Sequence, residues 1–352
     1  MARSALTITL LGLGLTIFGL LMVGSSSVVD AARDFGDKWY YLKLQSGWAV
    51  MGLAGFFLIS RWPYQKLEKL SVSLLLITLL LLVLVLIPGL GSKLLGARRW
   101  LSLGFFSFQP AELAKLTLAI YFSSLLKKAT RFRPFIIVLG LTGLLIMLEP
   151  DLGTTLILTG SSLLTYFGSG GQLRYLGLII PVFIIAAAAL VFFSPYRLDR
   201  LKTFFDYSRD PLGSSYHIRQ VLLSLGSGGV FGVGLGQSKQ KYEFLPEATT
   251  DSIFAVIGEE LGLVGGLVVI AAFLVFMRQG FLIAASAPDQ FGANLVLALT
   301  SWISLQALVN LGAMVAIIPL TGVPLPFISY GGSSLVLVLL ASGILVNIAK
   351  QK

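Results

Sequence analysis

The chain has 352 residues, of which 56% are hydrophobic and 12% are charged, and its formal net charge is +10. Soluble domains usually contain about 45–50% apolar and about 25% charged residues, so this composition excludes an ordinary soluble protein. The chain has no cysteine and one histidine, His217, which excludes disulfides and thiolate sites and disfavours a multi-histidine metal site.

Apolar segments separated by charged residues, proline or glycine predict about ten membrane-spanning helices. The block from Leu74 to Ile87 contains no charge, and with its flanks it reaches the roughly 20 residues that cross about 30 Å of hydrocarbon. The first segment is too long for the core of a cleavable signal peptide, and further spans follow it. The predicted spans are 5–24, 45–60, 69–89, 109–126, 134–149, 154–168, 175–193, 253–276, 292–316 and 334–348.

The distribution of Lys and Arg predicts the orientation in the membrane. Twelve of these residues lie in the segments on the N-terminal side, against six in the opposite short loops. Short loops rich in Lys and Arg stay in the cytoplasm, whereas long loops do not follow this rule. We therefore expect an all-α integral membrane protein that forms a single polytopic domain over residues 1–352. Both termini are expected in the cytoplasm, with a large extracytoplasmic loop, about 194–252, between the seventh and eighth spans.

The outer loops are rich in cationic side chains, contrary to the topology rule. Arg binds diphosphate oxygens in a bidentate manner, so these cations favour an anionic ligand on the outer face. The alternative is a solvated loop next to anionic lipid headgroups. The outer cations are Arg98, Arg99, Arg197, Arg200, Lys202, Arg209, Arg219, Lys239 and Lys241.

A glycine-rich stretch, 226–236, lies in the long outer loop. It lacks the preceding strand that a dinucleotide-binding fingerprint requires, so we expect a re-entrant or membrane-skimming loop. The segment LPEATTD (245–251) ends the long loop and places Asp251 at the start of the eighth span. Thr250 or Asp251 could cap that helix. Alternatively, Asp251 acts as a general base, with its pKa set by burial and by neighbouring cations.

Four charged residues lie in the interior of predicted spans, away from their terminal residues. Glu112 and Lys115 are three residues apart on the fourth span and can pair on one face. Glu259 and Glu260 lie in the eighth span. Charges at membrane depth usually indicate function, but a structural ion pair that braces the bundle is an equal alternative for Glu112 and Lys115.

Two connections between spans have informative sequences. In EPDLGTT (149–155), Asp151 is expected to cap the following helix in a tight turn. PLPFISYGGSS (324–334) contains two prolines and two glycines, which preclude a regular helix. Irregular backbone at membrane depth is tolerated only where it lines a cavity or is buried in protein, so we expect this segment to form a wall of the site.

Several of these stretches, taken in order, resemble the SEDS family (shape, elongation, division, sporulation) over essentially the whole chain. Within that family the chain is more similar to the division branch than to the elongation branch. The stretches are GARRWL (96–101), FQPAELAKL (108–116), EPDLGT (149–154), DPLGSSYHIRQ (210–220), GSGGVFGVGLGQS (226–238), LPEATTD (245–251), FAVIGEELG (254–262) and LPFISYGGSS (325–334).

The resemblance implies ten transmembrane helices and a peptidoglycan glycosyltransferase that polymerises lipid II at the outer face of the bacterial cytoplasmic membrane. The essential aspartate of the family falls on Asp251, and its glutamate and lysine fall on Glu112 and Lys115. The family commonly has histidine where this chain has Thr249, so any role of that histidine does not carry over. The implied partners are a class B penicillin-binding protein transpeptidase and other membrane proteins of division or elongation; nucleic acid is not expected.

On this hypothesis Asp251 deprotonates the acceptor sugar, and cations stabilise the departing diphosphate. No cofactor is required by the sequence, and a divalent cation, Mg²⁺ or Mn²⁺, is compatible with it. A lipid II flippase and a non-catalytic division scaffold are the alternative functions. The candidate substrate-binding residues are Arg98, Arg99, Glu112, Lys115, Arg197, Arg200, Arg219, Glu247 and Ser329.

Overall fold

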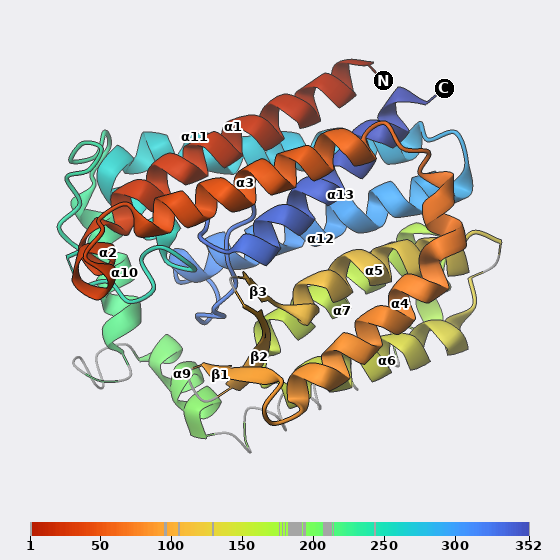
Figure 1. Ribbon diagram of the computed structural model, residues 1–352, viewed down its shortest axis with the longest axis horizontal. Coiled ribbons are helices and arrows are strands. Elements are labelled where there is room, and N and C mark those ends of the chain that lie inside the picture. The colour runs from red at the N-terminus through yellow and green to blue at the C-terminus, as the bar shows by residue number, and fades with distance from the viewer. Residues whose placement is uncertain are drawn as a thin grey trace.

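The computed structural model describes residues 2–94, 97–104, 106–128, 130–175, 177, 179, 181, 192, 195–206, 213, 215–242 and 244–351. Most of these residues are helical, and the long helices run side by side in one bundle (Figure 1). Both termini lie at the same end of the bundle (Figure 1), as the even number of predicted spans requires.

Nine of the ten predicted spans coincide with helices in the described part of the chain, whereas the seventh, 175–193, falls mostly outside it. Six of the helices, α1, α3, α4, α11, α12 and α13, are long and apolar enough to cross a membrane. The nine are α1 (Ala2–Ser26), α3 (Tyr40–Ile59), α4 (Gln65–Leu86), α5 (Pro110–Leu125), α6 (Phe132–Leu148), α7 (Leu152–Gly168), α11 (Ile253–Ala285), α12 (Gln290–Met314) and α13 (Gly332–Lys350).

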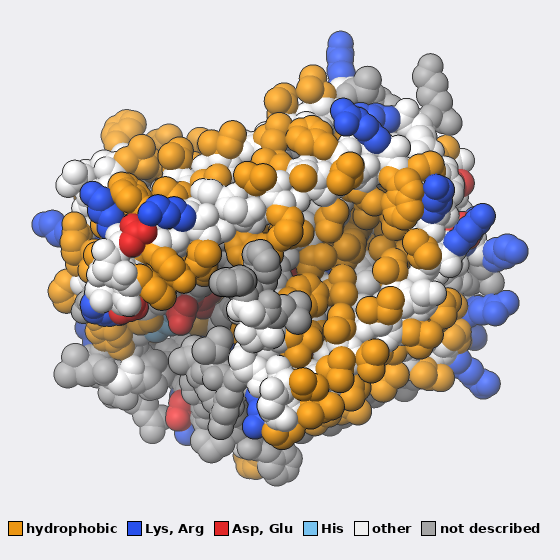
Figure 2. Space-filling view, viewed as in Figure 1, with side chains coloured by type: hydrophobic (Ala, Val, Ile, Leu, Met, Phe, Trp, Pro, Cys, Tyr) orange, Lys and Arg blue, Asp and Glu red, His pale blue; other side chains and the backbone are white. Residues whose placement is uncertain are grey.

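The surface of the bundle agrees with a membrane environment. Figure 2 shows hydrophobic side chains over the flanks of the helices, with Lys and Arg gathered at the two ends. α12 and α13 form the centre of the bundle. In the apolar stretch of each of these helices 78% of the residues are buried, compared with 22% in α3 and 28% in α4. α12 packs against α5, α7 and α11, and α13 packs against α1 and α3. The two central helices therefore carry the loop between them, 315–331, into the middle of the protein.

Short elements cover the end opposite the termini (Figure 1). A short 3-10 helix (Leu173–Tyr175), which is not one of these elements, follows α7. The elements at the covered end are α2 (Val28–Phe35), β1 (Gly91–Leu94), β2 (Ala97–Leu103), β3 (Phe106–Phe108), α9 (Pro195–Phe205) and α10 (Tyr216–Ser227).

The three strands form an antiparallel sheet in the order β1-β2-β3, which the sequence analysis did not predict. Gly104 has a φ of 73° between β2 and β3, a conformation that suits a tight hairpin turn and favours glycine. The strands are too short, and too rich in charge and glycine, for a clear two-residue alternation of apolar side chains. The all-α expectation therefore holds for the bundle and is wrong for this outer segment.

The long helix α11 is broken at Gly262, whose φ is 67° and ψ is −165°. The break lies about 15 Å from the start of the helix, well inside the span. The glycine-rich loop after α10 docks against it: Val233 N–H donates to the Glu259 carbonyl at 3.0 Å, and Leu263 N–H donates to the Gly229 carbonyl at 2.9 Å. The loop is therefore re-entrant, and each irregular segment satisfies the backbone groups of the other.

A buried polar cluster fixes this loop in place. Glu260 accepts hydrogen bonds from Lys241 Nζ at 3.0 Å and from Ser25 Oγ of α1 at 2.8 Å. Glu259 accepts from Ser238 Oγ at 2.6 Å and from Ser224 Oγ of α10 at 3.1 Å. The two intramembrane glutamates thus join three segments, and Lys241, predicted among the outer cations, is used as an internal ion-pair partner.

Candidate active site

Asp251 lies in a tight turn just before α11, at the end of the bundle opposite the termini. The carbonyl of Glu247 accepts hydrogen bonds from the N–H groups of Thr250 and Ser252, both at 3.1 Å. Glu247 has a φ of 52°, a left-handed conformation that is strained for a residue other than glycine. Ser252 occupies the N-cap position of α11, so the expectation that Thr250 or Asp251 caps this helix is wrong.

The carboxyl group of Asp251 is buried, with 7% of the residue exposed. Burial, and after it the negative charge of Glu247, raise the pKa of Asp251, the Arg200 guanidinium acts in the opposite direction, and the resulting pKa is about 7. A carboxyl with a pKa near neutrality exchanges a proton at the working pH, as a general acid or base must. Glu247 itself is exposed, and its carboxylate accepts a hydrogen bond from the Thr250 hydroxyl at 2.7 Å.

The loop between α12 and α13 forms the wall behind Asp251, as the sequence predicts. Tyr330 N–H donates to the Thr249 carbonyl at 2.8 Å, and the buried Ser329 hydroxyl donates to the Thr250 carbonyl at 2.5 Å. The Ser329 hydroxyl also accepts from Leu325 N–H at 2.8 Å, so its only proton and one of its two lone pairs hold two loops together. Ser329 is thus a scaffold residue in this structure, although the sequence analysis named it as a substrate ligand.

Glu112 and Lys115 of α5 form a buried ion pair with a distance of 2.6 Å between Nζ and Oε1. Lys115 Nζ also donates to Gln306 Oε1 of α12 at 2.8 Å, and Gln306 Nε2 donates to the Pro324 carbonyl at 3.0 Å. The pair therefore reaches the wall loop through one glutamine. Of the two interpretations that the sequence left open, this geometry favours bracing.

Two amides of α12 that the sequence analysis missed complete this support. Gln306 and Asn310 are four residues apart and therefore lie on the same face of the helix. Asn310 Nδ2 donates to the carbonyls of both Asp251 and Val323 at 2.8 Å. The available signal was a pair of amides at helical spacing in an apolar span, which at membrane depth indicates a specific partner.

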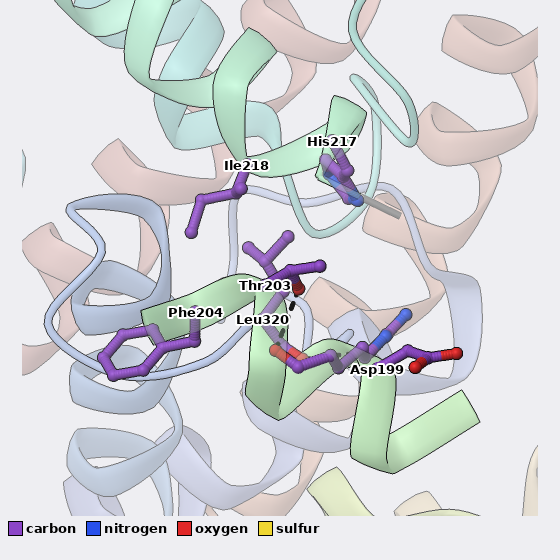
Figure 3. A pocket seen from close by; sticks show the side chains of 7 residues that line it. Asp199, Thr203, Phe204, His217, Ile218 and Leu320 are labelled. Atoms are coloured by element: carbon purple, nitrogen blue, oxygen red, sulfur yellow. Dashed lines mark hydrogen bonds between the residues drawn. The ribbon is translucent and has the colours of Figure 1, made fainter. Parts of the chain in front are cut away.

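A cavity of about 330 Å³ lies near the turn that carries Asp251, between α9, α10 and Leu320 of the loop between α12 and α13 (Figure 3). Arg200 lines one side of the cavity, and its Nη1 donates to the Leu320 carbonyl at 3.0 Å. His217 Nε2 forms a hydrogen bond with Ser252 Oγ at 2.7 Å, which ties the cavity to the residue after Asp251. The lining residues are Asp199, Arg200, Thr203, Phe204, His217, Ile218 and Leu320.

The other predicted cations are not gathered around Asp251. Arg99 donates to the carbonyls of Glu149 at 2.9 Å and Pro150 at 2.7 Å, so it holds the turn after α6. Arg98 on β2 and Arg219 on α10 are partly exposed and make no side-chain hydrogen bond within the described part of the chain. The side chain of Arg197 lies outside the described residues.

Asp151 follows the predicted pattern and caps α7, accepting from Thr154 N–H at 3.0 Å. Among the described residues, no three or more His, Asp or Glu side chains are arranged to hold a metal ion.

Curated relatives match the chain along nearly its whole length. Stage V sporulation protein E of Bacillus subtilis (strain 168) is 39% identical over 98% of this chain and 96% of its own. The probable peptidoglycan glycosyltransferase FtsW of Trichlorobacter lovleyi is 40% identical over 99% of this chain and 94% of its own. The FtsW of Nitrosococcus halophilus is 42% identical over 96% of this chain and 91% of its own.

Solved structures share the fold at lower sequence identity. A chain from a peptidoglycan synthase complex, studied for its coordination of polymerization and crosslinking, matches with a TM-score of 0.80 and 27% identity, covering 97% of this chain and 96% of that one. The rod shape determining protein RodA of Thermus thermophilus matches with a TM-score of 0.72 and 26% identity, covering 97% and 95%. The family model for the cell cycle proteins FtsW, RodA and SpoVE matches residues 5–352, and the chain therefore belongs to this family.

Proposed function

We propose that this protein is a peptidoglycan glycosyltransferase that extends glycan strands from lipid II at the outer face of the bacterial cytoplasmic membrane. The names of the FtsW relatives support the reaction class. The observation that carries the proposal is the position of Asp251: its buried carboxyl has a pKa of about 7, and the charge of Arg200, which lines the outer cavity, acts on it.

The reaction follows from this arrangement. The carboxylate of Asp251 accepts the proton of the C4 hydroxyl of the acceptor N-acetylglucosamine, and the resulting oxygen attacks the anomeric carbon of the donor muramyl sugar. The bond from that carbon to the diphosphate oxygen breaks with inversion, and undecaprenyl diphosphate leaves. Among the described cations, Arg200 is the one whose charge acts on the Asp251 carboxyl. It stabilises the charge on the departing diphosphate. Asp251 then releases its proton to solvent.

The same proposal extends to partners and to metal dependence. The relatives above favour a role of the FtsW type, in division, over one of the RodA type. Since a structural relative belongs to a complex that coordinates polymerization with crosslinking, we propose a class B penicillin-binding protein transpeptidase as the partner.

We propose no resident cofactor. Mg²⁺ or Mn²⁺ would enter only with the diphosphate, and a titration of the polymerase activity with EDTA tests this.

Purified protein with lipid II tests the function directly. We expect the wild type to form glycan polymer, alone or with its transpeptidase, and Asp251→Asn to form none while being at least as thermally stable as the wild type. Asp37→Asn is the matched control, because Asp37 is an outer carboxylate paired with Lys43 on the surface. A wild-type rate for Asp251→Asn would overturn the proposal and favour a non-catalytic scaffold. Transbilayer movement of lipid II without polymer would favour a flippase.

A further inference from the structure

The single histidine of the chain faces the cavity next to Asp251. His217 lies in the first turn of α10, across the cavity from Asp199 and Thr203 of α9 (Figure 3). It does not belong to the mechanism described above. It nevertheless lines the same cavity as Arg200 and contacts Ser252, the residue after Asp251.

One ring nitrogen of His217 is held by the protein, and the other is open. Nε2 is 2.7 Å from Ser252 Oγ, and Ser252 is fully buried at the start of α11. Nδ1 makes no hydrogen bond to any residue that the structure describes. The hydroxyl of Ser252 thus fixes the plane of the ring and leaves one nitrogen for a ligand.

The imidazole is neutral at physiological pH. Burial, together with the charge of Arg200, lowers the pKa of His217 to about 4. A neutral imidazole offers one donor and one acceptor, and with one nitrogen bound to Ser252 the other suits a neutral polar group. The charged Arg200 lines the same cavity and matches a diphosphate better, so the cavity offers a cation and a neutral hydrogen-bonding group.

We propose that His217 is a specificity-determining residue that contacts the substrate, and that its Nδ1 forms a hydrogen bond with a hydroxyl or acetamido group of the lipid-linked sugar. Ser252 is a positioning residue for the ring. This inference rests on the proposed glycosyltransferase function and adds a sugar contact to it.

Steady-state kinetics of polymerisation with purified lipid II tests the inference. His217→Phe keeps the ring size and removes both hydrogen-bonding nitrogens, and a hydrogen bond to a neutral ligand is worth about 1 kcal/mol. We expect the KM for lipid II to rise about five- to tenfold, while kcat changes by less than about threefold. His217→Gln restores a donor and an acceptor, and we expect it to return KM to within about twofold of the wild type. A purely structural role would not produce this rescue.

Two further variants keep the inference falsifiable. Ser252→Ala frees the ring and is expected to raise KM about threefold, a smaller effect because the contact itself remains. Ser227→Ala is the control, since it removes a hydroxyl of α10 that bonds only within the helix, to the Ser224 carbonyl. An unchanged KM in His217→Phe overturns the inference. If that variant does not fold, an unchanged KM in Ser252→Ala overturns it.

The results separate this inference from the proposed function. An inactive Asp251→Asn together with a wild-type KM in His217→Phe refutes the sugar contact alone. Full activity of Asp251→Asn refutes the proposed function, whatever His217 does.

Discussion

Asn310 connects α12 to the turn that carries Asp251: its Nδ2 donates to the Asp251 carbonyl at 2.8 Å and, at the same distance, to the carbonyl of Val323 in the wall loop. One buried amide therefore sets the spacing between the candidate base and the wall behind it. The carboxyl of Asp251 depends for its position on a residue that the substrate does not need to touch.

Asn310→Leu is expected to lower polymerase activity more than tenfold and stability by about 1–3 kcal/mol, because two buried carbonyls lose their donor. Asn347→Leu is the matched control: Asn347 Nδ2 donates to the carbonyls of Ile59 and Trp62 at the end of the bundle that carries the termini. Thermal unfolding in detergent and the initial rate measured below the melting temperature give the two effects separately. Equal activity loss in both variants would show that general destabilisation explains the result.

The pair Glu112–Lys115 predicts a strong difference between single and double variants. Lys115→Met leaves a buried carboxylate without its partner and is expected to cost about 3–5 kcal/mol of stability, whereas Glu112→Gln combined with Lys115→Met restores much of it. Thermal unfolding of the purified variants measures both. A Lys115→Met protein that is as stable as the wild type but inactive would mean that the lysine acts on the substrate instead of bracing the bundle.

The raised pKa of Asp251 has consequences for activity and for stability. Only the ionised carboxylate accepts a proton, so with a pKa of about 7 the rate at pH 6 is expected to be about a tenth of the plateau at high pH. A pH–rate profile of polymerisation, with a buffer and salt control, measures this limb. A rate that stays constant from pH 8 to pH 5 would contradict a titrating Asp251.

The stability effect has the opposite direction. Because the pKa of Asp251 is higher in the folded protein than the ordinary aspartate value of 3.8, the stabilising contribution of its proton is fully present below pH 3.8 and is lost as the pH rises through about 7. Asp251→Asn should therefore be more stable than the wild type at pH 8, with a smaller difference at pH 5. Melting temperatures at the two pH values check the sign.

The docking of the glycine-rich loop on α11 predicts that Gly232 tolerates no side chain. Its φ is 81°, and a Cβ at this position would lie 2.2 Å from the Glu260 carbonyl oxygen. Gly232→Ala is expected to lower the melting temperature clearly and to reduce expression. Gly226→Ala is the control, because a Cβ at that helical position meets no atom within 4 Å. Similar stability of the two variants would contradict the close packing of the loop against the broken helix.

Local patterns predicted the parts of this protein that depend on neighbouring residues in the chain. Long apolar segments located the helices, because the hydrocarbon core demands a minimum length of apolar residues. The even number of predicted spans placed both termini at one end, and Asp151 was correctly assigned as a cap because capping acts over three residues. The position of Asp251 before the eighth span followed from its place in LPEATTD, whereas its role as the essential aspartate was implied by the resemblance to the family.

Tertiary packing alone decided which polar groups meet. Ser25 and Glu260 are 235 residues apart and form a hydrogen bond, and Arg99, predicted for an anionic ligand, instead holds the carbonyl of Glu149. Hydropathy and spacing report the environment of a residue along its own helix and carry no information about distant partners. The contacts of Asn310 and His217 with the Asp251 turn arise only once α10, α11 and α12 pack together, because buried polar groups must then find partners across helices.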